Sequence, residues 1–197
     1  MELFDAVADD NRGRVRELLD GGINPNIRDV FGGTVLIDAS LQGYTYIVRL
    51  LLDSGADPDI TGNFGVTALM VASEYGRIHI VRLLLEHNAD PDITDNYGET
   101  ALMIASHYGR TQIVGLLLEH NADPNIKNRD GSTALMIAED KGYTEIARLI
   151  HEHIDLQRSK QDLSVATSFI PRLGYDTPLR YLDNDTLVKI MSSRRPN

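Results

Sequence analysis

The sequence predicts an all-α fold in which short helix-turn-helix units stack in a row, followed by a short C-terminal helical segment. Two observations predict it. Prolines, threonines and glycines recur at intervals of 33 residues, and each interval carries two apolar stripes at helical spacing. Repeats of this length are typical of a solenoid, in which each unit contacts only its neighbours. The recurring positions are Pro25, Pro58, Pro91 and Pro124, Thr34, Thr67, Thr100 and Thr133, and Gly43, Gly76, Gly109 and Gly142.

The first helix of each unit carries its apolar residues three apart, as Leu69 and Ala72 do. A linking glycine follows, and the second helix then carries Ile80, Val81 and Leu84 at helical spacing. A helix of about nine residues is marginal in water, so neighbouring units must supply the other wall of the core. The equivalents of the first pair are Leu3/Ala6, Leu36/Ala39, Leu102/Ala105 and Leu135/Ala138.

The second helix of each unit is predicted to end at a residue that accepts a left-handed backbone. Gly22, Gly55, Asn88 and Asn121 occupy this position, and glycine and asparagine are the two residue types that favour it. The proline that follows blocks further helix, and the next segment, such as "DNYG", forms a turn.

The units "GNFGVTALMVASEYGRIHIVRLLLEHNADPDI" and "DNYGETALMIASHYGRTQIVGLLLEHNADPNI" resemble ankyrin repeats. That resemblance implies an ankyrin-repeat solenoid with β-turn fingers and a concave groove that binds partner proteins. Two positions in the first helix depart from the family pattern, because Ala or Val replaces its Pro, and Ile or Met replaces its His. The residues at the His position are Ile37, Met70, Met103 and Met136, so apolar burial must replace the expected Thr-to-His hydrogen bond.

The two ends of the repeat array deviate from the pattern. Glu17 stands where later units have Leu50 or Leu83, which suits a solvated end. Ile154 falls where Gly or Asn should end the last helix, and a β-branched residue resists the left-handed conformation. We therefore predict an array over residues 1–154, with a capping unit at 1–27, repeats that begin near 28, 61, 94 and 127, and a separate segment at 155–197.

The predicted target-binding residues are aromatic and arginine side chains at variable positions of the groove. Both types dominate interface energetics. The alternative is that these side chains only pack on their neighbours. The candidates are Phe31, Phe64 and Tyr97 in the fingers, Tyr75 and Tyr108 before the linking glycine, and Arg77 and Arg110 after it.

The composition argues against several other classes of function. The chain of 197 residues has no cysteine, so neither a disulfide framework nor a thiolate site is available. His87 and His120 recur at one position in successive units, which favours a role at the helix end over metal binding. No nucleophile, base or phosphate-binding loop is placed for catalysis. We expect a non-enzymatic protein without cofactor or metal.

The formal charge of −10 is unevenly distributed along the chain. Residues 155–197 hold seven Lys and Arg against five Asp and Glu, so the acidic excess belongs to residues 1–154. This excess repels nucleic acid. The chain shows neither the pattern of a signal peptide nor an apolar run long enough for a membrane span. We expect a monomer in the cytoplasm or the nucleus, with no nucleic-acid or membrane partner.

The last 43 residues contain two helical patterns. "DLQRSKQDLSVATSF" predicts a helix that either covers the end of the stack or stands apart from it. "LDNDTLVKIMSS" resembles the first helix of an F-box, with Asp183 in place of the usual proline and the chain ending before a full motif. The matching apolar residues are Leu182, Leu187, Ile190 and Met191.

Ankyrin arrays followed by a shortened F-box-like element resemble host-range proteins of large DNA viruses. That resemblance implies an adaptor that brings a target to a cullin ubiquitin ligase through its Skp-type subunit. It also implies a host cell as the place of action. The alternative is a plain binding or masking protein, in which the C-terminal helices only cap the stack.

Overall fold

A computed structural model describes residues 2–169, with side chains for residues 2–161. All regular structure in this part of the chain is helical, with no strand and one isolated bridge between Arg28 and Thr34. The predicted all-α class is confirmed. The helices are α1 (Glu2–Ala8), α2 (Arg12–Asp20), α3 (Val35–Gln42), α4 (Thr45–Asp53), the 3₁₀ turn η1 (Asn63–Gly65), α5 (Ala68–Glu74), α6 (Ile78–Glu86), α7 (Ala101–His107), α8 (Thr111–Glu119), α9 (Ala134–Asp140) and α10 (Thr144–Phe169).

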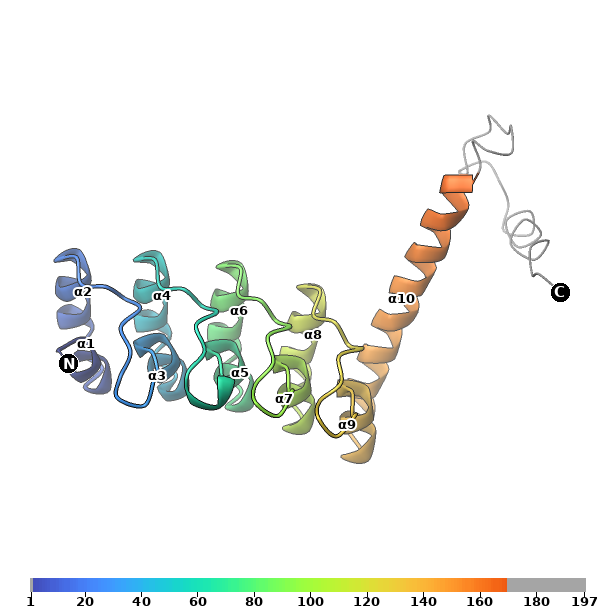
Figure 1. Cartoon of the computed structure of the whole chain (residues 1–197), viewed down its shortest axis with the longest axis horizontal. Helices are drawn as coiled ribbons and strands as arrows, with labels where there is room; N and C mark the ends of the chain where they lie inside the picture. Colours follow the sequence, from blue (N-terminus) through green and yellow to red (C-terminus); the bar gives the residue numbers. More distant parts are fainter. Residues whose placement is uncertain (1, 170–197) are drawn as a thin grey trace. The chain divides into compact units, whose positions relative to one another are not determined.

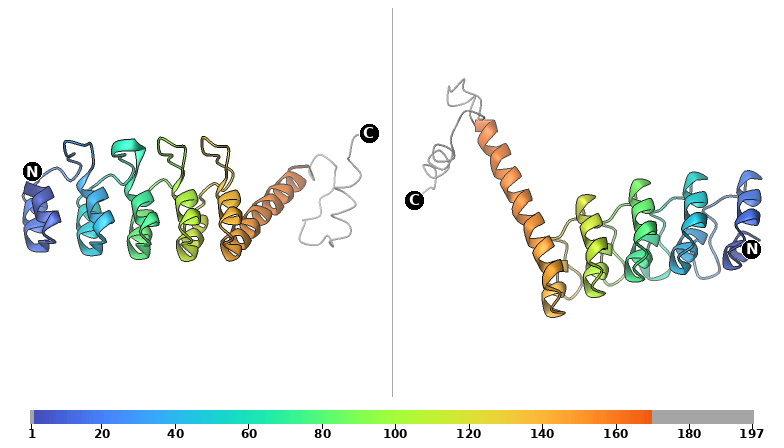
Figure 2. Two further views of the ribbon diagram at one scale, coloured as in Figure 1. Left: turned by 90° about the horizontal axis from the view of Figure 1, so that it is seen from below. Right: turned by 180° about the vertical axis from the view of Figure 1, so that it is seen from behind.

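The helices pack as a linear stack of pairs (Figure 1). The odd-numbered helices from α1 to α9 contact one another in one row, and α2, α4, α6 and α8 form a second row. Each loop between two pairs runs out to one side as a finger before the next first helix begins (Figure 2). Contacts therefore join sequence neighbours, as the repeat predicts.

The core lies between the two rows and between successive pairs. Leu69, Ile80 and Leu84 are at most 1% exposed. Burial of one such side chain stabilises the fold by about 1.5–3 kcal/mol. Their buried equivalents in other units are Leu3, Leu36, Leu102, Ile47, Ile113, Ile146, Leu51, Leu117 and Ile150.

Threonine side chains begin the first helices. The hydroxyl of Thr67 accepts a hydrogen bond from the Met70 backbone N–H at 3.3 Å, and the same contact recurs at Thr34, Thr100 and Thr133. The Thr67 N–H in turn donates to the Met70 sulfur at 3.5 Å. Met70 and Met103 are 1% exposed, so apolar burial occupies the position where the family pattern has His.

The second helices end as predicted. Gly22 and Gly55 have φ of +84°, and Asn88 and Asn121 have φ of +61° and +63°. The backbone N–H of Ala89, just after Asn88, donates to the carbonyl of Leu84 at 3.0 Å, so the helix end is closed by main-chain hydrogen bonds.

The exit segments of successive units are joined by side chains. The Asp59 carboxylate accepts a hydrogen bond from the Asp90 backbone N–H at 2.8 Å, and Asp92 accepts one from Asp123 at the same distance. Asn26 makes the first such contact, with the Asp57 N–H. Burial, together with the neighbouring carboxylates, raises the pKa of Asp59 and of Asp92 despite these hydrogen bonds.

The last second helix does not end where the earlier ones do. Ile154 lies inside α10, a single helix of 26 residues, so the helix predicted over residues 155–169 is not a separate element. The chain divides into two compact units between His151 and Glu152, and the boundary predicted after residue 154 falls inside α10. Leu182, Leu187, Ile190 and Met191 lie outside the described residues. Among residues 2–169, no helix is both long and apolar enough to cross a bilayer.

Candidate target-binding groove

The finger tips carry the most exposed aromatic side chains of the described region. Phe31, Phe64 and Tyr97 are between 62% and 70% exposed. One such residue projects from each of three successive units, as the sequence predicts. In the last finger Asp130 takes this place and is also exposed.

The fingers are held by side-chain hydrogen bonds at their bases. The Asp95 carboxylate accepts from the backbone N–H groups of Tyr97 and Glu99, both at 2.8 Å. Asp29 and Asn128 do the same in their own fingers. Gly62 occupies this position in the second finger, which instead forms η1 and places Phe64 at φ +62°. This finger therefore differs from the others in local backbone while presenting the same kind of side chain.

Backbone hydrogen bonds also join one finger to the next. The Asn96 N–H donates to the Phe64 carbonyl at 2.7 Å, and the Arg129 N–H donates to the Tyr97 carbonyl at 2.9 Å. The approach is close, because a Cβ on Gly98 would lie 3.1 Å from the Asn128 Cα atom. Phe64 and Tyr97 are therefore carried on turns that backbone hydrogen bonds join to each other. The first finger reaches the second through the Arg28 side chain, which donates to the Thr61 carbonyl at 2.7 Å.

The second pair of predicted aromatics lies at the other end of the first helices. Tyr75 and Tyr108 end α5 and α7 and are 50% and 45% exposed. A hydrogen bond with the Glu74 carboxylate raises the pKa of Tyr108. The rings of His107 and Tyr108 lie 5.0 Å apart between centroids. Tyr108 thus contacts the preceding unit and still exposes much of its surface.

Arg77 and Arg110, predicted as target-binding residues, stabilise the stack. The guanidinium of Arg110 donates twice to the Glu74 carbonyl, at 3.1 and 2.9 Å. Arg77 donates to the Leu41 carbonyl at 3.4 Å. Each cation thus lies at the C-terminal end of the preceding first helix, where carbonyl groups are unpaired and the helix dipole favours positive charge.

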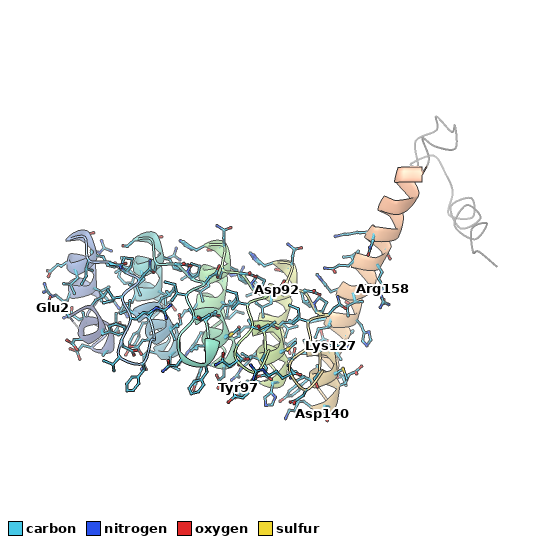
Figure 3. All side chains as sticks on the ribbon, viewed as in Figure 1. Glu2, Asp92, Tyr97, Lys127, Asp140 and Arg158 are labelled. Carbon is cyan, nitrogen blue, oxygen red and sulfur yellow. The ribbon has the colours of Figure 1, made fainter. Side chains whose placement is uncertain are left out.

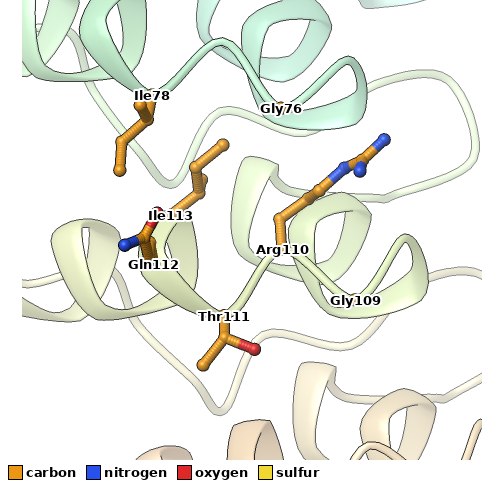
Figure 4. A pocket seen from close by; sticks show the side chains of 7 residues that line it. All are labelled: Gly76, Ile78, Gly109, Arg110, Thr111, Gln112 and Ile113. Atoms are coloured by element: carbon orange, nitrogen blue, oxygen red, sulfur yellow. The ribbon is translucent and has the colours of Figure 1, made fainter.

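The position of Arg110 is visible beside a shallow hollow of about 270 Å³ between two linking loops (Figure 4). The side chain extends from the loop at Gly109 toward the loop at Gly76. The two hydrogen bonds of this guanidinium agree with the alternative that the side chain packs on its neighbours.

A larger hollow of about 600 Å³ lies between the last fingers and α9, which is the first helix of the last unit. Its lining combines finger residues with residues of α7 and α9, so fingers and first helices of the last units line one hollow. We refer to this hollow, together with the finger residues Phe31, Phe64 and Tyr97, as the groove. Glu99, Asp130, Glu139 and Asp140 line it, and none of them was predicted as a site residue. Glu99 could have been found from the sequence, because the position before the repeated threonine varies between units, as Gly33, Val66, Glu99 and Ser132.

The groove lies away from the exit segments. Figure 3 shows Tyr97 and Asp140 toward one edge of the stack, whereas Asp92 lies away from that edge. Across residues 2–161, no group of three or more His, Asp or Glu side chains is arranged to hold a metal ion. The groove presents exposed aromatic side chains, backbone turns and carboxylates, which are groups that can contact a partner protein.

A family model described as ankyrin repeats in three copies matches residues 3–95 and 88–160. The comparison with curated proteins gives no match.

Proposed function

The chain belongs to the ankyrin-repeat family, whose repeats form protein-protein interaction domains, and we propose that this one holds a segment of a target protein in the groove. Ankyrin-repeat proteins are typically non-enzymatic interaction modules. The observation that carries the proposal is the row of exposed aromatics at Phe31, Phe64 and Tyr97, of which Phe64 and Tyr97 lie on fingers joined by backbone hydrogen bonds. Rigid, exposed aromatic side chains are frequent binding hot spots.

Capture of partners from a eukaryotic cell lysate tests this function. The full chain and its Phe64→Ala/Tyr97→Ala variant are immobilised, and bound proteins are identified by mass spectrometry. Proteins held in the groove should be lost from the variant, with each hot-spot substitution weakening binding by about 1–3 kcal/mol.

Tyr46→Ala is the matched control for these substitutions. Tyr46 is an exposed aromatic on α4, outside the groove, where the guanidinium groups of Arg12 and Arg16 lie over its ring. Its removal should leave the captured proteins unchanged. If the Tyr46 variant loses the same proteins and the groove variant keeps them, the target-binding surface lies elsewhere.

We further propose that the protein delivers its target to a cullin ubiquitin ligase in the host cytoplasm or nucleus. The support is the sequence of residues 182–191, where Leu187 and Ile190 match the apolar positions of an F-box helix. A scaffold that holds both proteins acts by raising their local concentration.

Pull-down with a purified Skp-type adaptor distinguishes this role from plain binding or masking. Binding that is abolished by Leu187→Asp/Ile190→Asp, with an unchanged melting temperature, supports the ligase role. A sharp fall in melting temperature assigns these residues to capping of the stack. If the parent chain does not bind the adaptor, the ligase role is rejected and target binding by the groove still stands.

A further inference from the structure

The two ends of the groove offer a partner different chemistry. The finger tips are aromatic in the first three fingers, at Phe31, Phe64 and Tyr97, and become acidic at Asp130. A partner that follows the row of fingers therefore meets apolar surface first and carboxylates last.

The carboxylates of the hollow outnumber its cations. Glu99, Asp130, Glu139 and Asp140 line it together with Lys141 and His107. Within residues 2–161, Glu99, Asp130 and Asp140 have no ion pair, and Glu139 has a contact with His151 at 3.5 Å. Like charges gathered in this way repel one another, and a cation brought among them relieves that repulsion.

Three carboxylates of the first unit are held by arginine. Arg14 lies 3.1 Å from Glu2 and 3.2 Å from Glu17, and Arg12 lies 3.2 Å from Asp10. Exposed carboxylates such as Asp20, Glu86 and Glu119 have no ion pair within residues 2–161 either. The hollow differs from these sites because four carboxylates line one cavity.

The same hollow also contains apolar surface. Ile137 and Met136 contribute to its lining, and Met136 is 51% exposed. Lysine and arginine lay their aliphatic stems along apolar surface while the charged end stays in a polar environment. A basic side chain is therefore complementary both to the carboxylates and to the surface beside them.

The spacing of the fingers sets the form of the partner. Packed helices lie about 8–10 Å apart, and so do the fingers that precede them. An extended chain advances about 3.3 Å per residue, so about every third residue meets a new finger.

We propose that the groove holds an extended segment of a partner protein with apolar side chains over Phe31, Phe64 and Tyr97 and lysine or arginine side chains in the hollow at Glu99, Asp130 and Asp140. This inference rests on target binding by the groove and adds the chemical class of the partner.

Selection from a displayed library of random peptides about twelve residues long, enough to cross four fingers, tests it on the full chain. The selected peptides should be richer in Lys and Arg than the unselected library. A selected peptide, labelled for fluorescence anisotropy, should bind about tenfold more weakly to the Glu99→Gln/Asp130→Asn/Asp140→Asn variant.

The matched control removes the same number of charges from the ends of second helices. Asp20→Asn/Glu86→Gln/Glu119→Gln lies at the last residues of α2, α6 and α8, and it should change the affinity less than about twofold. An equal loss with both variants would mean that net charge alone attracts the peptide, which overturns the proposal.

The same selection distinguishes this inference from the function on which it rests. Peptides that lose affinity on Phe64→Ala/Tyr97→Ala but carry no excess of Lys and Arg leave the groove as the binding site and overturn the basic partner. Peptides that bind the aromatic variant as well as the parent, or a selection with no enriched peptide, count against both.

Discussion

Equivalent positions of the repeat are buried in the interior units and exposed in the last unit. Met70 and Met103 are 1% exposed, whereas their equivalent Met136 is 51% exposed, because a further unit follows α5 and α7, while α9 is the last first helix of the described residues. Ser73 and Ser106 are fully buried, and Glu139 takes their place at the exposed end. Burial in this fold is thus set by the neighbouring unit, and residue type follows it.

The largest expected effect comes from placing glutamate, the residue of the last unit, at the equivalent buried position of an interior unit. Ser106→Glu places a carboxylate in a site that is 0% exposed and should cost about 4 kcal/mol of unfolding free energy. The reverse change at the end, Glu139→Ser, should stay within about 0.5 kcal/mol. Urea denaturation followed by circular dichroism measures both, and similar values for the two variants would remove the distinction between interior and end.

Truncation of the equivalent methionines should show the same contrast at smaller size. Met103→Ala opens a cavity in a closed site and should cost about 2–4 kcal/mol. Met136→Ala removes a side chain that is half in solvent and should cost less than about 1 kcal/mol. A costly Met136→Ala in the same urea titration would show that the end of the stack is covered in solution.

The third comparison concerns the residue with a left-handed backbone that ends the second helix of each unit. Asn121→Ile copies the residue at position 154 into an interior unit, and a β-branched residue at φ +63° should cost about 1–2 kcal/mol. Asn121→Gly, which copies Gly22 and Gly55, should be nearly neutral. Thermal unfolding of both variants checks this, and a tolerated isoleucine would mean that the exit segment can rearrange.

The smallest effect concerns the exit carboxylates, whose contacts between units stop before the last unit. The raised pKa of Asp59 and Asp92 means that their charge destabilises the fold, so their contribution improves as the pH falls through the folded-state pKa. Asp59→Asn/Asp92→Asn keeps an oxygen acceptor, as Asn26 does, and should stabilise the protein at neutral pH by about 0.5 kcal/mol after solvent screening.

Melting temperatures across pH test this sign. The advantage of the asparagine variant should disappear as the pH approaches the ordinary aspartate value of 3.8. If the advantage of the asparagine variant grows as the pH falls, the pKa values of Asp59 and Asp92 are lowered in the folded protein and not raised.

The repeated residues made most of the fold predictable. Pairs such as Leu69 and Ala72, and the left-handed stops at Asn88 and Asn121, depend on local chemistry that recurs in every unit. Ile154 indicated that the last second helix lacks the usual Gly or Asn at its end, but only the structure shows that this helix continues to Phe169.

The groove was less predictable because it depends on contacts between units. The exposed finger aromatics follow from their place in the repeat, whereas the hydrogen bonds of Arg110 to the Glu74 carbonyl depend on which loop lies beside it. Glu99 and Asp140 belong to different units, and only stacking brings them to one hollow.

The half-exposed side chain of Met136 makes this end of the array accessible to a chemical oxidant. Mild peroxide should convert Met136 to the sulfoxide well before Met70 or Met103, whose thioethers are shielded. The oxidation rate of this one side chain, followed by peptide mass, therefore reports from within the protein whether anything lies over the end of the stack.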